Sequence, residues 1–269
     1  MKISLINAGK RYNREWIFRN FSYEFSSGNS YAIIGPNGSG KSTLLQAIGG
    51  ALMLSEGQVL YELGVGTNKI NQEIEARSQE PGARSDKLTL EKEVGSQESL
   101  AISIDKVSEN SPATNHKLQT SLTERQDTNS QVQPENIYQY LSIAAPYLEL
   151  IEEMTVKEFL RFHQQFKPFL PSVTIDSIIT TIGLEKASDK QIRYYSSGMK
   201  QRVKLAQAIF SEVALVLLDE PCTNLDAEGI ALYLQLINEY CQQRLVIVSS
   251  NDSAEYAFCN ERVNIVDYK

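Results

Sequence analysis

Residues 35–43 read Gly35-Pro36-Asn37-Gly38-Ser39-Gly40-Lys41-Ser42-Thr43 and fit G-x-x-x-x-G-K-[ST], the pattern of a loop that wraps the phosphates of a nucleotide. Such a loop needs glycine because a Cβ would keep backbone N–H groups away from the phosphate oxygens. Ser30-Tyr31-Ala32-Ile33-Ile34 before the loop predict a buried strand, and Thr43–Ile48 after it predict a helix. This context favours a nucleotide site over a chance match by a Gly/Ser-rich turn.

The polar residues of this phosphate loop each receive an expected role. We expect Lys41 to reach between the β- and γ-phosphates and the hydroxyl of Ser42 to bind Mg²⁺. The helix that begins at Thr43 would point its positive end at the phosphates. The other cofactor-binding candidates would line the phosphates with their backbone; they are Gly35, Asn37, Gly38, Ser39 and Gly40.

Two carboxylates follow another predicted strand. Asp219-Glu220 comes directly after the apolar run 214–218, which lacks polar alternation and is typical of a central parallel strand. Ligands bind at the carboxyl ends of such strands, so we expect Asp219 to hold Mg²⁺ through water and Glu220 to orient or deprotonate the attacking water. The alternative is an ordinary strand-end turn before Pro221, which the phosphate loop upstream disfavours.

Composition restricts the class of protein. The chain has 269 residues, 42% of them hydrophobic, and a net charge of −7, which argues against a nucleic-acid binder. No apolar run approaches the ~20 residues that span a bilayer, and the N-terminal apolar stretch is too short for a signal peptide. Three cysteines without metal-ligand spacing, Cys222, Cys241 and Cys259, suggest a reducing cytoplasm.

The segment 66–134 differs from the rest of the chain. It contains no Phe, Tyr, Trp, Met or Cys and is rich in polar residues, so it can bury too little apolar surface to offset its ordering entropy. We expect a disordered or loosely ordered insertion, in which Leu88–Leu90 and Leu100–Ile104 could pair as edge strands. Without it about 200 residues remain, which is a normal size for one α/β domain.

The remaining residues alternate predicted strands and helices. Residues 1–34 have strand-like alternation, with turn signals at Asn13-Arg14 and Ser26–Gly28. Further strands are predicted at 137–144, 214–218 and 245–249, and helices at 155–166, 176–183, 227–241 and from Ser196 through Val213. Thr155 and Glu158 form a capping-box pattern at the start of the first of these helices.

A third motif lies just before the Asp-Glu strand. Tyr195-Ser196-Ser197-Gly198-Met199, followed by Lys200-Gln201-Arg202, resembles the signature of ABC-type ATPases, Leu-Ser-Gly-Gly-Gln followed by x-Gln-Arg. Thr223–Asp226 resembles the D-loop of that family, and Tyr12 resembles the aromatic that stacks on the adenine. The resemblance covers residues 1–65 and 135–269, and the order of the motifs is highly specific.

The resemblance implies a fold and a ligand. The expected fold is α/β: a P-loop NTPase core with a mostly parallel sheet, an N-terminal antiparallel β-subdomain and an inserted helical subdomain at 145–195. Residues 1–269 would form a single nucleotide-binding domain that takes ATP and Mg²⁺.

In this family two such domains dock head to tail with two ATP molecules between them, which explains the signature. The start of the signature helix in one chain faces the γ-phosphate held by the other, so Ser196, Ser197 and Gly198 join the cofactor-binding candidates. Ser196 also fits a plain helix N-cap, and the two interpretations are compatible. Lys200–Arg202 could simply be a solvated face. The resemblance leaves a homodimer and a heterodimer open.

The chain departs from the family pattern at two positions. Asn251 stands where a His is expected, and Asn can hydrogen-bond a phosphate or a water but cannot titrate. The Gln expected within Ile143–Glu149 is absent, and Glu149 could replace it only across a gap of one or two residues. Both departures concern hydrolysis, so with Glu220 and Asn251 as catalytic candidates we expect firm ATP binding and slow or partner-dependent hydrolysis.

The leading hypothesis is the ATP-binding subunit of an ABC transporter, held at the inner face of the membrane by a separate transmembrane permease. Residues 155–183 would contact the permease, and the Ser-Gly-Met-Lys-Gln-Arg ending hints at an exporter. A soluble ABC ATPase, such as one for cofactor-cluster assembly, and a non-catalytic nucleotide-gated module are the alternatives. The insertion would be a regulatory or docking tail, or a tolerated loop expansion.

Overall fold

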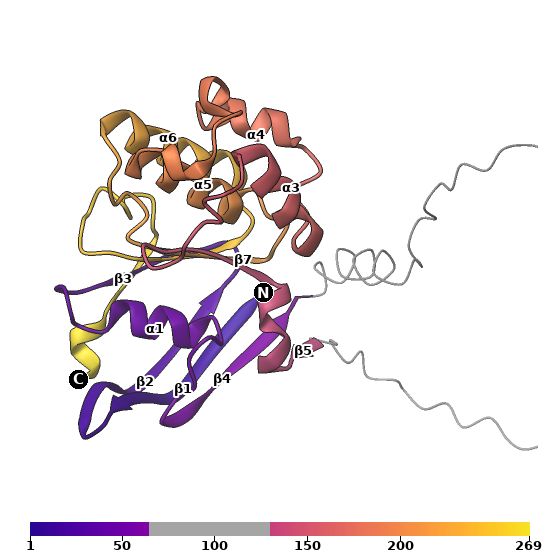
Figure 1. The fold of residues 1–269 in the computed structure, drawn as a ribbon. Coiled ribbons are helices and arrows are strands. Elements are labelled where there is room, and N and C mark those ends of the chain that lie inside the picture. Colours follow the sequence, from indigo (N-terminus) through magenta and orange to yellow (C-terminus); the bar gives the residue numbers. More distant parts are fainter. Residues whose placement is uncertain (65–129) are drawn as a thin grey trace, which may run out of the picture. The chain divides into compact units, whose positions relative to one another are not determined.

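The computed structural model describes residues 1–64 and 130–269 (Figure 1). Most of the expected insertion, with both of its expected edge strands, lies outside the described residues. Its last residues are described, and Ser130–Val132 form strand β5, which pairs with β4 (Glu56–Leu63). The predicted end of the insertion at residue 134 is therefore too late, since the Val132 side chain is buried in the core.

An antiparallel sheet begins the chain, as expected. Within the described residues its strand order is β2-β1-β4-β5, with β1 at Lys2–Tyr12 and β2 at Glu15–Ser26. The hairpin turn contains Asn13 at φ 54°, a left-handed conformation that Asn tolerates. Its inner face buries aliphatic and aromatic side chains, among them Ile3, Leu5, Phe18, Phe21 and Phe25.

The second sheet is parallel throughout its described pairs and has the order β6-β7-β8-β3-β9. Its strands are β3 (Ser30–Ile34), β6 (Leu141–Ala144), β7 (Leu215–Asp219), β8 (Leu245–Ser249) and β9 (Glu261–Asn264). Every residue of β7 and β8 is buried, which confirms the prediction of covered central strands from their unbroken apolar sequences.

The parallel sheet separates two hydrophobic cores. Side chains of successive residues in β7 point to opposite faces, so Leu215 and Leu217 enter one core while Val216 and Leu218 enter the other. The first core contains the antiparallel sheet and α1 (Lys41–Ile48). The second contains four α-helices, which Figure 1 shows together: α3 (Val156–Phe166), α4 (Ile175–Thr181), α5 (Ser197–Ile209) and α6 (Ala227–Tyr240).

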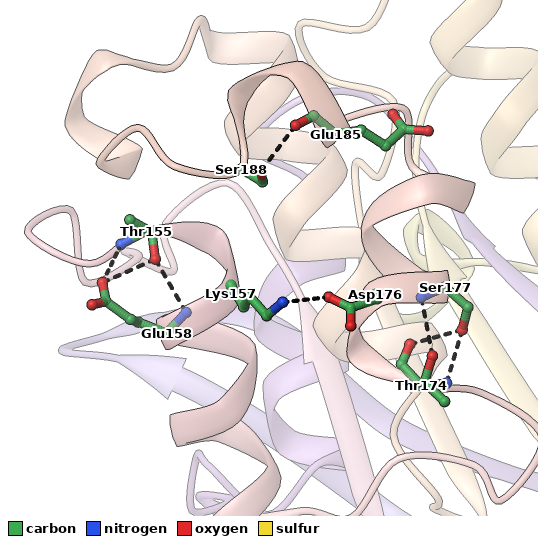
Figure 2. A network of polar contacts seen from close by, with 8 residues as sticks. All are labelled: Thr155, Lys157, Glu158, Thr174, Asp176, Ser177, Glu185 and Ser188. Atoms are coloured by element: carbon green, nitrogen blue, oxygen red, sulfur yellow. Dashed lines mark hydrogen bonds and ion pairs between the residues drawn. The ribbon is translucent and has the colours of Figure 1, made fainter.

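Two threonines start the helices of the inserted helical segment (Figure 2). The Thr155 side chain caps the N–H of Glu158, and the Glu158 carboxylate accepts from the Thr155 N–H, so the predicted capping box is present. Thr174 and Ser177 form the same arrangement at α4. Lys157 joins the two helices through a 2.6 Å ion pair with Asp176. The short 3-10 helices η2 (Glu185–Ala187) and η3 (Ile192–Tyr194) complete this segment.

The strand predicted at 137–144 is wrong in its first half. Pro134–Gln139 form the 3-10 helix η1, and only Leu141–Ala144 form a strand. Pro134 lies in the first turn of η1, and the Tyr140 N–H closes the last turn on the Ile137 carbonyl. Lys167 donates to the carbonyls of Tyr138 and Leu141 and so fixes the change from helix to strand.

The helix predicted from Ser196 through Val213 ends earlier, at Ile209. The backbone after it bonds to the segment before α4 instead: the Leu170 N–H donates to the Phe210 carbonyl and the Glu212 N–H to Pro168. These tertiary hydrogen bonds replace a further helical turn. Across the two described ranges, no helix combines the length and the apolar character needed to cross a bilayer.

Candidate nucleotide-binding site

Three motifs that are far apart in the sequence meet at the carboxyl ends of the strands of the parallel sheet. Asp219 of β7 pairs with Ser249 of β8, and Ser249 pairs with Ile33 of β3. Neighbouring strands lie about 4.8 Å apart, so the carboxyl ends of these strands form a continuous row. The phosphate loop follows β3, Glu220 follows β7 and Asn251 follows β8.

The phosphate loop needs its glycines for space as well as for conformation. Gly35, Gly38 and Gly40 have φ values of 152°, 74° and 103°, which side-chain-bearing residues rarely adopt. A Cβ on Gly40 would lie 2.3 Å from Cγ2 of Ile17 in β2. Asn37 and Gly38 are exposed at the tip of the loop.

The helix after the loop begins at Lys41, two residues before the predicted start at Thr43. The Leu44 N–H donates to the Gly40 carbonyl at 2.9 Å and closes the first turn, so Ser42 and Thr43 both lie within it. Lys41 is 5% exposed, and its Nζ donates to the carbonyls of Gly35 and Pro36 at 3.0 and 3.2 Å. The ammonium group therefore lies across the phosphate loop.

Buried polar atoms without a partner mark the same edge. Among the described residues, Ser39 Oγ, Asp219 Oδ1 and Ser249 Oγ are buried and accept or donate no hydrogen bond within the chain. Native proteins rarely leave such atoms unsatisfied, and Asp219 is only 2% exposed. These oxygens fit a site that is completed by a ligand.

The residues present fit Mg²⁺ together with phosphate. The described parts of the chain hold no cluster of three or more His, Cys, Asp and Glu side chains. Mg²⁺ does not need one, because it typically takes one or two protein oxygens and completes its shell with substrate phosphates and water. Asp219 and the Ser42 hydroxyl can supply those protein oxygens.

Glu220 has a strained backbone. Its φ is 43°, in the left-handed region that a non-glycine residue enters at an energetic cost. Its N–H donates to the Ser249 carbonyl at 2.8 Å, and its carbonyl accepts from the Thr223 N–H at 3.1 Å. These bonds hold the residue in place directly beyond the last paired position of β7.

Asn251 is exposed in a loop that is tied to the sheet through Ser250. The Ser250 N–H donates to the Ile33 carbonyl, and its Oγ accepts from the Asp252 N–H. Sequence reasoning missed a neighbour, Glu255, whose Oε1 accepts from the Cys222 N–H at 2.8 Å. Burial raises the pKa of Glu255, and the carboxylates of Asp252 and Glu220 add to that increase. No pattern in the sequence distinguishes this glutamate.

The signature residues contact the loop after β7. Ser196 is the N-cap of α5, and its Oγ accepts from the Met199 N–H at 3.2 Å. A Cβ on Gly198 would lie 3.0 Å from the Asn224 carbonyl oxygen, while Ser197 is exposed. Gly198 therefore lies beside the D-loop-like segment, and Ser196 and Ser197 at the start of α5 are exposed.

The interpretation of Lys200–Arg202 as a solvated face is wrong. Gln201 is 3% exposed and donates from Nε2 to the Pro221 carbonyl. Lys200 forms an ion pair with Glu152, and Arg202 lies 3.6 Å from Asp226.

Tyr12 lies at the end of β1, in the hairpin whose second strand contacts Gly40. Tyr12 is 49% exposed, and Lys10 Nζ lies 5.2 Å from the centroid of its ring. An accessible ring in this position is available for stacking.

The comparisons with known proteins agree with this arrangement. A family model described as ABC transporter matches residues 18–223. An uncharacterized ABC transporter ATP-binding protein of Bacillus subtilis is 25% identical over 93% of this chain and 85% of its own length. A spermidine/putrescine import ATP-binding protein of Mycoplasmopsis synoviae is 23% identical over 98% of this chain and 64% of its own length. The dimeric structure of a bacterial ABC transporter cassette superimposes with a TM-score of 0.61 at 18% identity, over 98% of this chain and 94% of that chain.

Proposed function

The chain belongs to the ABC transporter family through its ATP-binding domain, and on this premise we propose that it is the ATP-hydrolysing subunit of a transporter whose permease is a separate chain. Domains of this family bind ATP or ADP and generally hydrolyse ATP. The observation that carries the proposal is Asp219, a buried carboxylate with an unpartnered oxygen, at the same end of the parallel sheet as the phosphate loop.

Each residue of the site has its own role in this proposal. Lys41 and the N–H groups of the phosphate loop would bind the phosphates, while Ser42 and Asp219 would hold Mg²⁺, which would offset charge on the phosphate oxygens. Glu220 orients the attacking water and accepts its proton. Tyr12 stacks on the adenine.

A second ATPase domain completes the site. Ser196–Gly198 lie at the start of α5 and contact the segment after β7, so in a head-to-tail dimer they would face the γ-phosphate bound by the other chain. ABC ATPases form dimers and pair with transmembrane subunits. We propose that α3 and α4 face the permease and hold this chain at the inner face of the membrane.

The direction of transport follows from the permease. The signature ending Ser-Gly-Met-Lys-Gln-Arg favours efflux, whereas the relative from Mycoplasmopsis synoviae is named an import protein. Co-purification with the permease, followed by flux measurements in vesicles, tests both points.

Steady-state ATP hydrolysis over a series of protein concentrations tests the catalytic proposal. We expect turnover to rise more steeply than linearly with concentration, because dimerisation completes the site, and to fall at least about a hundredfold in Glu220→Gln. Nucleotide affinity should be retained in that variant. ATP binding without turnover at any concentration would instead support a non-catalytic module or a required partner.

A further inference from the structure

Glu255 is a buried acidic residue to which the proposed function gives no role. It lies four residues after Asn251, in the loop that follows β8, and is 5% exposed. A carboxyl group at this depth is normally held by hydrogen bonds, because its burial is otherwise costly. Its contacts therefore indicate what it does for the surrounding chain.

The Glu255 side chain reaches the turn that begins at Glu220. Its Oε1 accepts from the Cys222 N–H at 2.8 Å, and Cys222 is itself buried, at 8% exposure. The Thr223 N–H closes the turn by donating to the Glu220 carbonyl at 3.1 Å. The carboxyl group thus holds the turn at a point two residues beyond Glu220.

The main chain of Glu255 is held by other partners. Its carbonyl accepts from the Tyr233 hydroxyl of α6 at 2.8 Å, and its N–H donates to the Asp252 carbonyl at 3.1 Å. Asp252 follows Asn251 directly, and its N–H donates to Ser250 Oγ. The side chain of Glu255 therefore extends from the loop that carries Asn251, at a residue whose main-chain polar groups are both bonded.

The turn depends on contacts of this kind. Glu220 has a φ of 43°, a conformation that persists in a non-glycine residue only where the surroundings hold it. Buried main-chain N–H groups are nearly always paired, and the Cys222 N–H takes its acceptor from Glu255. A carboxyl or amide oxygen can accept this bond, whereas an apolar side chain cannot.

We propose that Glu255 is a positioning residue for ATP hydrolysis: by accepting from the Cys222 N–H, it fixes the turn that carries Glu220 against the loop that carries Asn251. This inference rests on the proposed function of the same site. Glu255 acts through the placement of these two residues rather than by contact with the nucleotide. A displacement of about 1 Å in reacting groups can slow an enzyme by about a hundredfold.

The test compares Glu255→Gln with Glu255→Leu in the full-length protein. Gln keeps an oxygen that can accept from the Cys222 N–H, and Leu has none. In steady-state ATP hydrolysis we expect kcat to fall about ten- to a hundredfold in Glu255→Leu, with KM within about twofold of wild type. In Glu255→Gln, kcat should stay within about threefold of wild type, because the bond is retained.

Tyr61→Phe is the matched control for the loss of one buried hydrogen bond. The Tyr61 hydroxyl donates to the Ile48 carbonyl at 3.0 Å, and both residues belong to the core that contains the antiparallel sheet. This variant should be less stable in urea without a lower kcat. Titration with a fluorescent ADP analogue counts the binding-competent chains in each sample, so kcat is expressed per folded site.

Glu255→Asp tests the same bond with a smaller change. It keeps the charge but withdraws the carboxyl group by one methylene, so kcat should fall by about threefold or more. This variant decides the question if Glu255→Leu does not fold. In an Asn251→Ala background, the fold-loss from either variant should be smaller, because one of the two positioned residues is then missing.

A wild-type kcat in Glu255→Leu, or in Glu255→Asp if the leucine variant does not fold, would overturn the inference and leave the proposed function intact. Equal losses in Glu255→Gln and Glu255→Leu would also overturn it, because the charge rather than the hydrogen bond would then matter. Equal losses with and without Asn251 would overturn the link between the two segments. A wild-type chain without turnover would refute the proposed catalytic function, and this inference with it.

Discussion

Gln201 Nε2 donates a 2.7 Å hydrogen bond to the carbonyl oxygen of Pro221, and the Gln201 side chain is buried. This bond connects α5 to the turn that follows Asp219 and Glu220. The Gln201 hydrogen bond thus joins α5 to the segment that carries the carboxylates of the site. The contact between Gly198 and Asn224 is a second connection between the same two segments.

The first prediction concerns that bond. Gln201→Leu keeps much of the side-chain volume but leaves the Pro221 carbonyl without its donor, so the free energy of unfolding should fall by about 1–3 kcal/mol. Urea denaturation measures the loss. Gln235→Leu, on the exposed face of α6, is the matched control and should change stability by less than about 0.5 kcal/mol. Equal effects of the two variants would contradict the role of the Gln201 bond.

Asn251→His tests whether the residue after β8 limits turnover. An imidazole can donate to the γ-phosphate and carry a positive charge near pH 6.5, which an amide cannot do. We expect kcat to rise roughly tenfold and to gain a pH dependence in that range. Asn251→Ala is the control and should be slower than wild type. The prediction is wrong if the histidine variant is no faster than the alanine variant.

A comparison of Gly40→Ala with Gly28→Ala distinguishes the cost of a steric clash from the cost of backbone strain. Both have positive φ, 103° and 89°, but only a Cβ on Gly40 meets another group, Ile17. Gly28→Ala should cost about 1–2 kcal/mol through backbone strain alone. Gly40→Ala should cost more and should also weaken nucleotide binding. Unfolding and binding measurements on both variants check this, and adding Ile17→Ala should recover part of the loss.

His163 makes stability depend on pH. Burial lowers its pKa to about 4, and the charge of Lys167 contributes. In the unfolded chain His163 binds a proton near pH 6.5, whereas in the folded chain it does so only near pH 4. Protonation therefore favours the unfolded chain, so the free energy of unfolding should fall as the pH decreases across this window. The size of this contribution is on the order of 2 kcal/mol. Urea midpoints at pH 7.5 and pH 5 should differ more for wild type than for His163→Gln, and identical differences would exclude this origin.

The sequence predicted the elements whose signals are local. The phosphate loop, the buried strands predicted at 214–218 and 245–249 and the capping box at Thr155 each depend on residues within a few positions of one another. Their residue types therefore predict the local conformation without knowledge of the distant partners. The two-sheet architecture was predicted from the resemblance to ABC-type ATPases, which depends on the order of the motifs.

What the sequence could not predict depends on partners distant along the chain. The bond from Gln201 to Pro221 joins two segments that only the folded chain brings together. The early end of α5 has the same cause, because Phe210 and Glu212 bond to residues near 170 rather than to the next helical turn. A periodicity argument extends a helix until an unsuitable residue appears, and here none does.

The division of β7 between two cores has a consequence for quality control during folding. Because its successive side chains belong to opposite faces, a strand paired one residue out of register would exchange Leu217 with Leu218 and still bury apolar groups on both sides. Such a misfolded chain would be compact and hard to recognise by exposed surface. It would nevertheless displace Asp219 from Ser249, so nucleotide binding reports on correct register more sensitively than compactness does.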